Sequence, residues 1–310
     1  MPKINVESSI VINASSEKIR DALIDFNTWP IWSPWLYMEP ESEVTFRGEV
    51  GEPGHGYDWQ GIKTGAGGMT LLSSSAEQIQ CDLQFLKPFK STAKVAFDIE
   101  AAGNEGTKVT WYMDSSLPFF LFWMKSLMVG MIKSDYNRGL ELFKDYIETG
   151  AIPSSTTVEG VVDVPEFHYI GTRAESAMAE IASSMNSSYQ QLKEASIADQ
   201  YSANYQPLCF YNSMNMKTHR CDYTAAIPTD NPVAASLPLI SATNTDCRAL
   251  KVVHKGPYRH LGNAWAMVMA EAREKKHKAR KSHAPFEIYK NDPTAVAEND
   301  LITEIYLPIK

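Results

Sequence analysis

The chain has 310 residues, of which 44% are hydrophobic and 21% are charged, a composition typical of folded globular proteins. Because domains usually hold roughly 100–200 residues, this length favours two of them. The formal net charge of -8 disfavours binding to nucleic acids, and the N-terminal residues lack the pattern of a secretory signal, so we expect a cytoplasmic protein. The four cysteines lack metal-binding spacing, and we predict neither a metal site nor a cofactor.

The first half of the chain predicts a strand, a helix, a run of short strands and a long helix. Residues 4–12 form a β-like run, and the Ser15 hydroxyl is suited to cap the helix that follows. Short β-rich runs between residues 41 and 113 predict an antiparallel meander. A long helix should then end at Gly150, because apolar residues recur at helical spacing before this glycine. These residues are Tyr136, Leu140, Phe143 and Ile147.

The most apolar stretch of the chain covers residues 117–132. It contains Lys125 and is shorter than the roughly 20 residues that a membrane-spanning helix needs, so we expect no membrane span. We interpret it as a buried segment that leads into the long helix. A lid over an apolar cavity and a surface that touches a membrane remain as alternatives.

A polar linker follows Gly150, and we place two domains at residues 1–150 and 158–310. Within the second domain the order strand, helix, strand, strand is predicted twice, with a loop rich in Pro, Ser, Thr and Asn between the copies. The first copy comprises residues 161–170, 178–192, 208–211 and 220–227, and the second comprises residues 248–254, 261–272, 286–289 and 301–309. The second half is therefore an internal structural repeat.

The first half carries the aromatic run Trp29-Pro-Ile-Trp-Ser-Pro-Trp35 after its first predicted helix. With this run and its order of elements, the segment 3–149 resembles the START-like polyketide cyclase/dehydrase superfamily. The resemblance implies an α+β helix-grip fold, in which a curved antiparallel sheet grips the last helix around an apolar ligand cavity.

Three sequence blocks in the second half, at residues 254–265, 286–293 and 303–309, resemble the gyrase-inhibitor-like, or AraC effector-binding, family. The blocks are His-Lys-Gly-Pro-Tyr-Arg-His-Leu-Gly-Asn-Ala-Trp, Phe-Glu-Ile-Tyr-Lys-Asn-Asp-Pro and Thr-Glu-Ile-Tyr-Leu-Pro-Ile. The resemblance covers residues 158–310 and implies two strand-helix-strand-strand modules with a ligand cleft between them. This expectation agrees with the repeat inferred from the hydrophobic pattern.

Six of the seven tryptophans lie in the first domain. Large rigid rings can form the wall of a cavity for a flat or greasy ligand, and Trp32, Trp59 and Trp111 are our candidates for such a wall. The alternative is that the rings only fill the core.

Glu304 is our candidate for the central residue of the second domain. In the terminal strand it alternates with Thr303 and Ile305 and shares a face with Ile302 and Tyr306, and a carboxylate among apolar neighbours is costly to bury without a partner. From the residues alone an exposed Glu304 is as reasonable as a functional one. The family resemblance implies a carboxylate at the floor of the cleft that meets cationic ligands. The candidate aromatic walls are Tyr211, Tyr258, Trp265, Tyr289 and Tyr306.

The basic run at residues 273–281 is interpreted as the solvated end of a helix, not as a nucleic-acid site. In the effector-binding family's transcription factors a helix-turn-helix precedes the ligand domain; here a helix-grip domain takes that place, which disfavours a DNA-binding regulator.

We therefore expect a protein that binds a hydrophobic, cationic or drug-like small molecule, for sensing or sequestration. The competing hypothesis is a hydrolase or cyclase that acts on a hydrophobic electrophile, with Glu304 as general base or nucleophile and Tyr258 as proton donor. A third hypothesis is a module whose clefts accept a protein partner.

Overall fold

A computed structural model describes residues 3–103, 106–117, 119–195, 201–202 and 204–310. The chain divides into two compact units, Met1–Pro153 (unit 1) and Ser154–Lys310 (unit 2).

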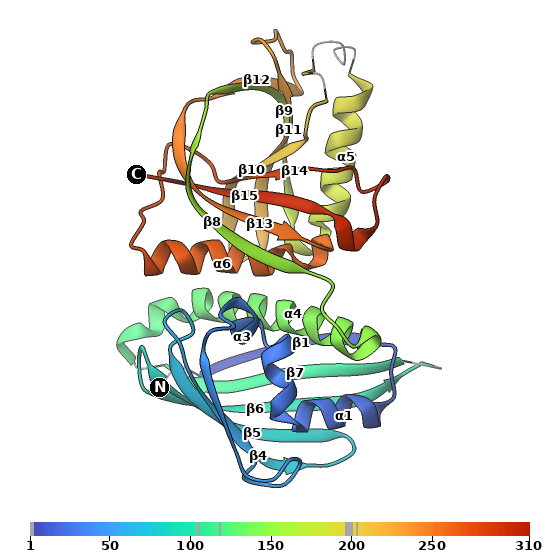
Figure 1. Ribbon diagram of the computed structural model, residues 1–310, viewed down its shortest axis with the longest axis vertical. Helices are drawn as coiled ribbons and strands as arrows, with labels where there is room; N and C mark the ends of the chain where they lie inside the picture. Colours follow the sequence, from blue (N-terminus) through green and yellow to red (C-terminus); the bar gives the residue numbers. More distant parts are fainter. Residues whose placement is uncertain (1–2, 104–105, 118, 196–200, 203) are drawn as a thin grey trace. The chain divides into compact units, whose positions relative to one another are not determined.

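Unit 1 is a seven-stranded antiparallel sheet with a long helix beside it, as expected from the first half of the sequence (Figure 1). The strands follow the order β1-β7-β6-β5-β4-β3-β2, so only β1 departs from chain order. The elements are β1 (Lys3–Ile12), α1 (Ser16–Ile24), α2 (Trp29–Trp32), α3 (Pro34–Met38), β2 (Glu43–Arg47), β3 (Gly56–Gln60), β4 (Ala66–Ser74), β5 (Gln78–Lys87), β6 (Ser91–Ala102), β7 (Gly106–Ser116) and α4 (Lys125–Thr149).

The ends of the helices in unit 1 follow from local chemistry. The Ser15 hydroxyl accepts a hydrogen bond from the backbone N–H of Lys18 and caps α1. Gly150 has a φ of 83° and ends α4 in the left-handed conformation that glycine adopts without steric cost. Tyr136, Leu140 and Phe143 of α4 are buried against the sheet, which confirms the helical spacing predicted from the sequence.

The apolar segment 117–132 forms a short 3-10 helix, Phe119–Met124, that leads into α4. Phe122 and Trp123 are 59% and 65% exposed, so the interpretation as a buried segment is wrong for these two rings. In the part of the chain that the structure describes, every helix is too short or too polar to cross a membrane.

Unit 2 is an eight-stranded antiparallel sheet with two helices, and Figure 1 shows how strongly β8 curves at one edge of it. The strand order is β12-β9-β11-β10-β14-β15-β13-β8. The elements are β8 (Ser155–Val164), β9 (Phe167–Ala177), α5 (Ile181–Glu194), β10 (Leu208–Asn215), β11 (Arg220–Thr229), β12 (Leu239–Asn244), β13 (Cys247–Lys255), α6 (Leu261–Glu274), β14 (Phe286–Tyr289) and β15 (Ile302–Ile309).

The predicted repeat is present as β9-α5-β10-β11 and β13-α6-β14-β15, which meet where β10 pairs with β14. Two further strands, β12 and β8, lie at the two edges of the sheet, outside the repeat. The expected single run at residues 161–170 is two strands, because Pro165 lies between β8 and β9 and cannot donate a ladder hydrogen bond. The loop expected between the copies contains β12, which pairs with the edge of β9 although half of its residues are polar.

Candidate functional site

The register of the central strands of unit 2 decides which side chains face the helices. Cys209 of β10, Glu287 of β14 and Ile305 of β15 lie directly opposite one another and therefore share one face of the sheet. Cys209 packs with residues of α5, and Ile305 packs with residues of α6. Both helices thus cover the face that carries Glu287, and Phe286 points to the other face.

On this helix-covered face a buried carboxylate lies among aromatic rings. Glu287 is 1% exposed and accepts hydrogen bonds from the indole N–H of Trp265, at 2.5 Å, and from the hydroxyl of Tyr289, at 2.7 Å. The hydroxyl of Tyr211 donates a third hydrogen bond. We call Glu287, Tyr211, Tyr258, Trp265 and Tyr289 the Glu287 cluster.

The rings of the Glu287 cluster come from four segments of the chain and are partly buried. Tyr211 of β10 meets Trp265 of α6 edge to face, with ring centroids 5.2 Å apart. Tyr258, in the 3-10 turn before α6, meets Tyr289 of β14 with centroids 5.6 Å apart. Tyr189 of α5 also contacts Tyr289. The cluster therefore draws on both modules of the repeat.

The electrostatics of the Glu287 cluster favour a positive charge. Burial raises the pKa of Glu287 and outweighs the hydrogen bonds from Tyr289, Trp265 and Tyr211, which lower it. Among the described residues no Lys, Arg or His forms an ion pair with Glu287. A buried carboxylate that has only neutral donors is poorly compensated, and an added cation would stabilise its charged form.

Glu304, our sequence candidate, lies on the opposite face of the sheet from Glu287. It pairs across the strands with Ile288, whose neighbours Glu287 and Tyr289 face the helices. Two ammonium groups neutralise Glu304, because Lys251 Nζ is 2.9 Å and Lys290 Nζ is 3.6 Å from its carboxylate oxygens.

Tyr306 lies beside Glu304 and donates its hydroxyl to that carboxylate at 2.8 Å. Burial alone would raise the pKa of Glu304, but the hydrogen bonds from Lys251 and Tyr306 and the nearby ammonium charges outweigh it, so the pKa is lowered. A carboxylate held in this way is a weak base.

The structure thus brings four of the predicted aromatic residues together, namely Tyr211, Tyr258, Trp265 and Tyr289, and leaves Tyr306 and Glu304 on the other face of the sheet. The carboxylate of this cluster, Glu287, was not among the sequence candidates. Strand alternation offered a signal, because Glu287 and Tyr289 are two residues apart in one predicted strand and must share a face.

The predicted wall of tryptophans in unit 1 consists mainly of core rings. Trp32 and Trp111 are 0% and 1% exposed. Trp111 stacks on Tyr136 of α4 with ring centroids 4.0 Å apart. The ring centroids of Trp32 and Phe143 are 4.6 Å apart. Trp59 is partly buried at the edge of this group, where its ring contacts Tyr57 and Phe85. The core of unit 1 therefore uses these rings as packing.

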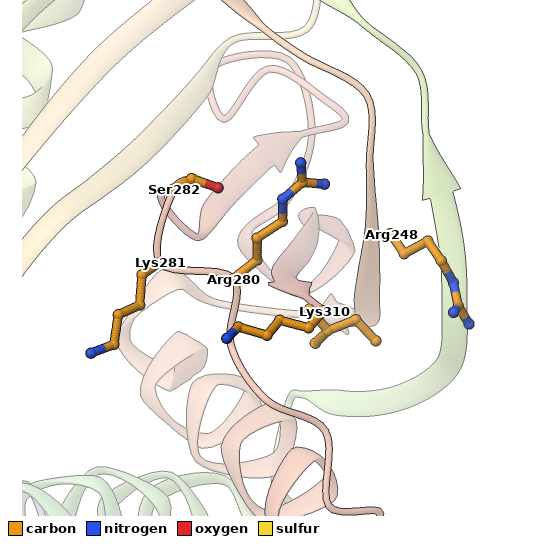
Figure 2. Close-up of a pocket in the computed structure, with 6 residues that line it drawn as sticks. Arg248, Arg280, Lys281, Ser282 and Lys310 are labelled. Atoms are coloured by element: carbon orange, nitrogen blue, oxygen red, sulfur yellow. The ribbon is translucent and has the colours of Figure 1, made fainter.

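A metal centre has no support in the described part of the chain, where no group of three His, Cys, Asp or Glu side chains could hold an ion. Two hollows on the surface of unit 2, one of them shown in Figure 2, are lined by other residues than the Glu287 cluster.

Unit 1 has a helix-grip-like α+β fold, and unit 2 has a duplicated strand-helix-strand-strand fold with a carboxylate buried among aromatic rings. The family model described as GyrI-like small molecule binding domain matches residues 160–310. The family model described as polyketide cyclase/dehydrase and lipid transport matches residues 3–148. The first half of the chain thus matches the second of these families and the second half matches the first, which confirms both resemblances inferred from the sequence. No curated protein matches the chain.

Solved structures similar to the chain include EcmrR in a cryo-EM complex with DNA, at 15% identity over 62% of this chain and 72% of that chain, with a TM-score of 0.44. SAV2435 bound to tetraphenylphosphonium matches at 18% identity over 50% and 94% of the two chains, with a TM-score of 0.38. The Aha1 dimer from Colwellia psychrerythraea matches at 18% identity over 47% and 98%, with a TM-score of 0.35.

Proposed function

We propose that unit 2 binds a lipophilic organic cation at the Glu287 cluster, and that the protein senses or sequesters this molecule. The observation that supports the proposal is a carboxylate 1% exposed that has three neutral hydrogen-bond donors and no cationic partner among the described residues. The proposal rests on complementarity of charge and on the aromatic rings around that charge.

Each part of the cluster has a role in such binding. The Glu287 carboxylate supplies the negative charge, in surroundings where water screens it weakly. The faces of Tyr211, Trp265 and Tyr289 attract a cation through their quadrupoles, each by about 0.5–2 kcal/mol. Their apolar area favours ligands that carry aromatic or aliphatic groups. A hydrated ion such as K⁺ gains little from these rings, so lipophilic cations are preferred.

The test is calorimetric titration of the full chain with tetraphenylphosphonium, a lipophilic cation with a delocalised charge. We expect Glu287→Gln to weaken binding at least tenfold, because the amide keeps the shape of the side chain and removes the charge. Glu304→Gln is the matched control, since it removes a carboxylate from the opposite face of the adjacent strand. This control should bind like the unchanged protein.

If Glu304 and not Glu287 binds the cation, the two variants should give the opposite result. Loss of binding in Glu304→Gln with binding kept in Glu287→Gln would return the role to the residue chosen from the sequence. Equal binding of tetraphenylphosphonium and of neutral tetraphenylmethane-type compounds would show that charge plays no part, and the proposal would fail.

A further inference from the structure

Large apolar side chains are exposed at one end of unit 1. Ile62 lies in the turn between β3 and β4 and is 79% exposed, and Phe89 lies in the turn between β5 and β6 and is 78% exposed. Phe122 and Trp123, which follow β7, are exposed as well. Single exposed apolar residues are ordinary on a protein surface, whereas a group of them marks an interaction site.

The register of the sheet places these segments at the same end. Ala66, the first residue of β4, pairs with Lys87, the last residue of β5. Ala93, near the start of β6, pairs with Ser115, near the end of β7. The β3–β4 turn, the β5–β6 turn and the segment after β7 therefore follow one another along one end of the sheet. Because neighbouring strands are about 4.8 Å apart, successive tips are spaced by about 10 Å.

The β3–β4 turn is held in a fixed shape by a buried carboxylate. Glu39 is 6% exposed and accepts hydrogen bonds of 2.8 to 3.0 Å from the backbone N–H groups of Ile62, Lys63 and Thr64. Gly65 completes the turn with a φ of 73°, a conformation that favours glycine. The shape of the turn depends on these groups and not on the Ile62 side chain, so folding does not explain why a large apolar residue stands there.

The apolar surface continues along the beginning of α4. Trp123, Leu127 and Met131 follow one another at intervals of four residues, the spacing of one helical face. All three are exposed, whereas Tyr136 and Leu140 of the same helix are buried against the sheet. The N-terminal part of α4 thus carries an apolar face that the core of unit 1 does not use.

The segments that carry these residues are positively charged, in contrast to the chain as a whole. Segments 84–93 and 115–134 contain four lysines and neither Asp nor Glu, although the chain has a net charge of -8. The four lysines are exposed, and within the described residues none of them forms an ion pair with a carboxylate. They are Lys87, Lys90, Lys125 and Lys133.

The carboxylates nearest to these segments in the sequence do not cancel that charge. Asp82 forms an ion pair with Lys94 at 2.5 Å, and Asp135 forms one with Arg138 at 2.6 Å. Asp114 accepts a hydrogen bond from a side-chain amide of β1 and keeps its negative charge. With Asp114 counted, the lysines still leave this end of the sheet positive.

From these observations we propose that this end of unit 1 docks on the surface of an anionic lipid bilayer. Aromatic and aliphatic side chains enter the interface between headgroups and acyl chains, while lysines bury their methylene groups there and hold their ammonium groups near the lipid phosphates. A protein partner fits less well, because lysine is depleted at protein–protein interfaces. This docking involves unit 1 only and does not depend on cation binding at the Glu287 cluster.

The test is co-sedimentation of the full chain with two kinds of vesicle, one of phosphatidylcholine alone and one with an equal amount of phosphatidylglycerol. We expect at least tenfold tighter binding to the mixed vesicles, because each lysine near an anionic surface adds roughly a factor of five. The difference should shrink as salt is added, since salt screens exposed charges.

Exposed apolar residues supply the variants. Phe89→Ala/Trp123→Ala should weaken binding to the mixed vesicles about tenfold, and Ile62→Ser should weaken it by roughly a factor of five, because these side chains no longer leave water. Val50→Ser is the matched control. Val50 is an exposed aliphatic residue in the connection between β2 and β3, at the opposite end of the sheet, and its variant should bind like the unchanged protein.

A second measurement locates the contact on the bilayer. Lipids brominated in their acyl chains quench tryptophans that enter the interface, so they should quench part of the fluorescence of the bound protein. Trp123→Phe keeps an apolar ring and should still bind, but this part of the quenching should be lost.

Three outcomes overturn the proposal. In the first, Phe89→Ala/Trp123→Ala and Ile62→Ser bind the mixed vesicles as Val50→Ser does. In the second, phosphatidylcholine vesicles are bound as tightly as the mixed vesicles, or neither kind is bound. In the third, the full chain forms dimers that Phe89→Ala/Trp123→Ala abolishes and that do not bind vesicles, which assigns the apolar surface to a second copy of the chain.

Discussion

Trp265 of α6 and Glu287 of β14 are joined by a hydrogen bond of 2.5 Å from the indole N–H to the carboxylate. This bond connects a helix of the second module to one of the two central strands of the sheet. It gives the buried carboxylate one of its three donors and fixes the ring that contacts Tyr211. One contact therefore serves both the packing of α6 and the charge distribution of the Glu287 cluster.

Replacing Trp265 by Phe should destabilise unit 2 by about 1–3 kcal/mol, because the buried carboxylate of Glu287 loses one of its hydrogen-bond donors. Amide hydrogen exchange of the slowest residues in β10 and β14 measures this change. Tyr258→Phe is the control, since the Tyr258 hydroxyl makes no hydrogen bond to Glu287. Equal losses in the two variants would contradict a special role for the indole N–H.

The affinity for a lipophilic cation should increase with pH. The pKa of Glu287 is raised above its ordinary value of 4.5, so the carboxyl carries a proton over part of the acidic range. A proton and a cationic ligand compete for the same carboxylate, and the affinity rises until the pH exceeds the folded-state pKa and then levels off. Titration with tetraphenylphosphonium from pH 4.5 to 8 measures this. Glu287→Gln should bind weakly at every pH, and a pH profile retained in this variant would assign the titration to another group.

Strand alternation and helical spacing were enough to predict the two sheets, α4 and the repeat of unit 2. They could not predict β12 (Leu239–Asn244), because it lies in a stretch rich in Pro, Ser, Thr and Asn and is held by pairing with β9. Nor could they locate Phe122 and Trp123, because an apolar sequence does not reveal whether tertiary neighbours cover it.

Glu304 was chosen as the candidate carboxylate because the family resemblance pointed to it, whereas the structure places Glu287 among the aromatic rings. Each glutamate has a large buried apolar residue next to it in its strand. Phe286 precedes Glu287 in β14, and Ile305 follows Glu304 in β15. Alternation tells which residues share a face but not which face the helices cover. The ion pair with Lys251 was equally hidden, since it depends on the pairing of β13 with β15.

Replacing Trp111 by Ala should destabilise unit 1 by about 3–5 kcal/mol, because it opens a cavity at the centre of the aromatic core. Six of the seven tryptophans lie in unit 1, so intrinsic fluorescence during urea unfolding reports mainly on this unit. Trp123→Ala is the control and should stay within about 0.5 kcal/mol, since this ring is 65% exposed. A small loss in Trp111→Ala would mean that the ring lines a space that solvent or a ligand can fill.

Replacing Glu304 by Gln should lower the stability of unit 2 by about 1–3 kcal/mol at pH 7, because Lys251 and Lys290 lose their counter-charge in a place where the carboxylate is only 14% exposed. The pKa of Glu304 is lowered from 4.5 in the folded state, so the folded chain binds this proton less readily than the unfolded chain does. The stabilisation by Glu304 is therefore present above about pH 4.5 and is lost as the pH falls through the folded-state pKa. Amide hydrogen exchange of β13 and β15 in the two proteins should give a difference at pH 7 that shrinks towards pH 3. A difference that is constant over this range would show that the variant acts through packing and not through the charge of Glu304.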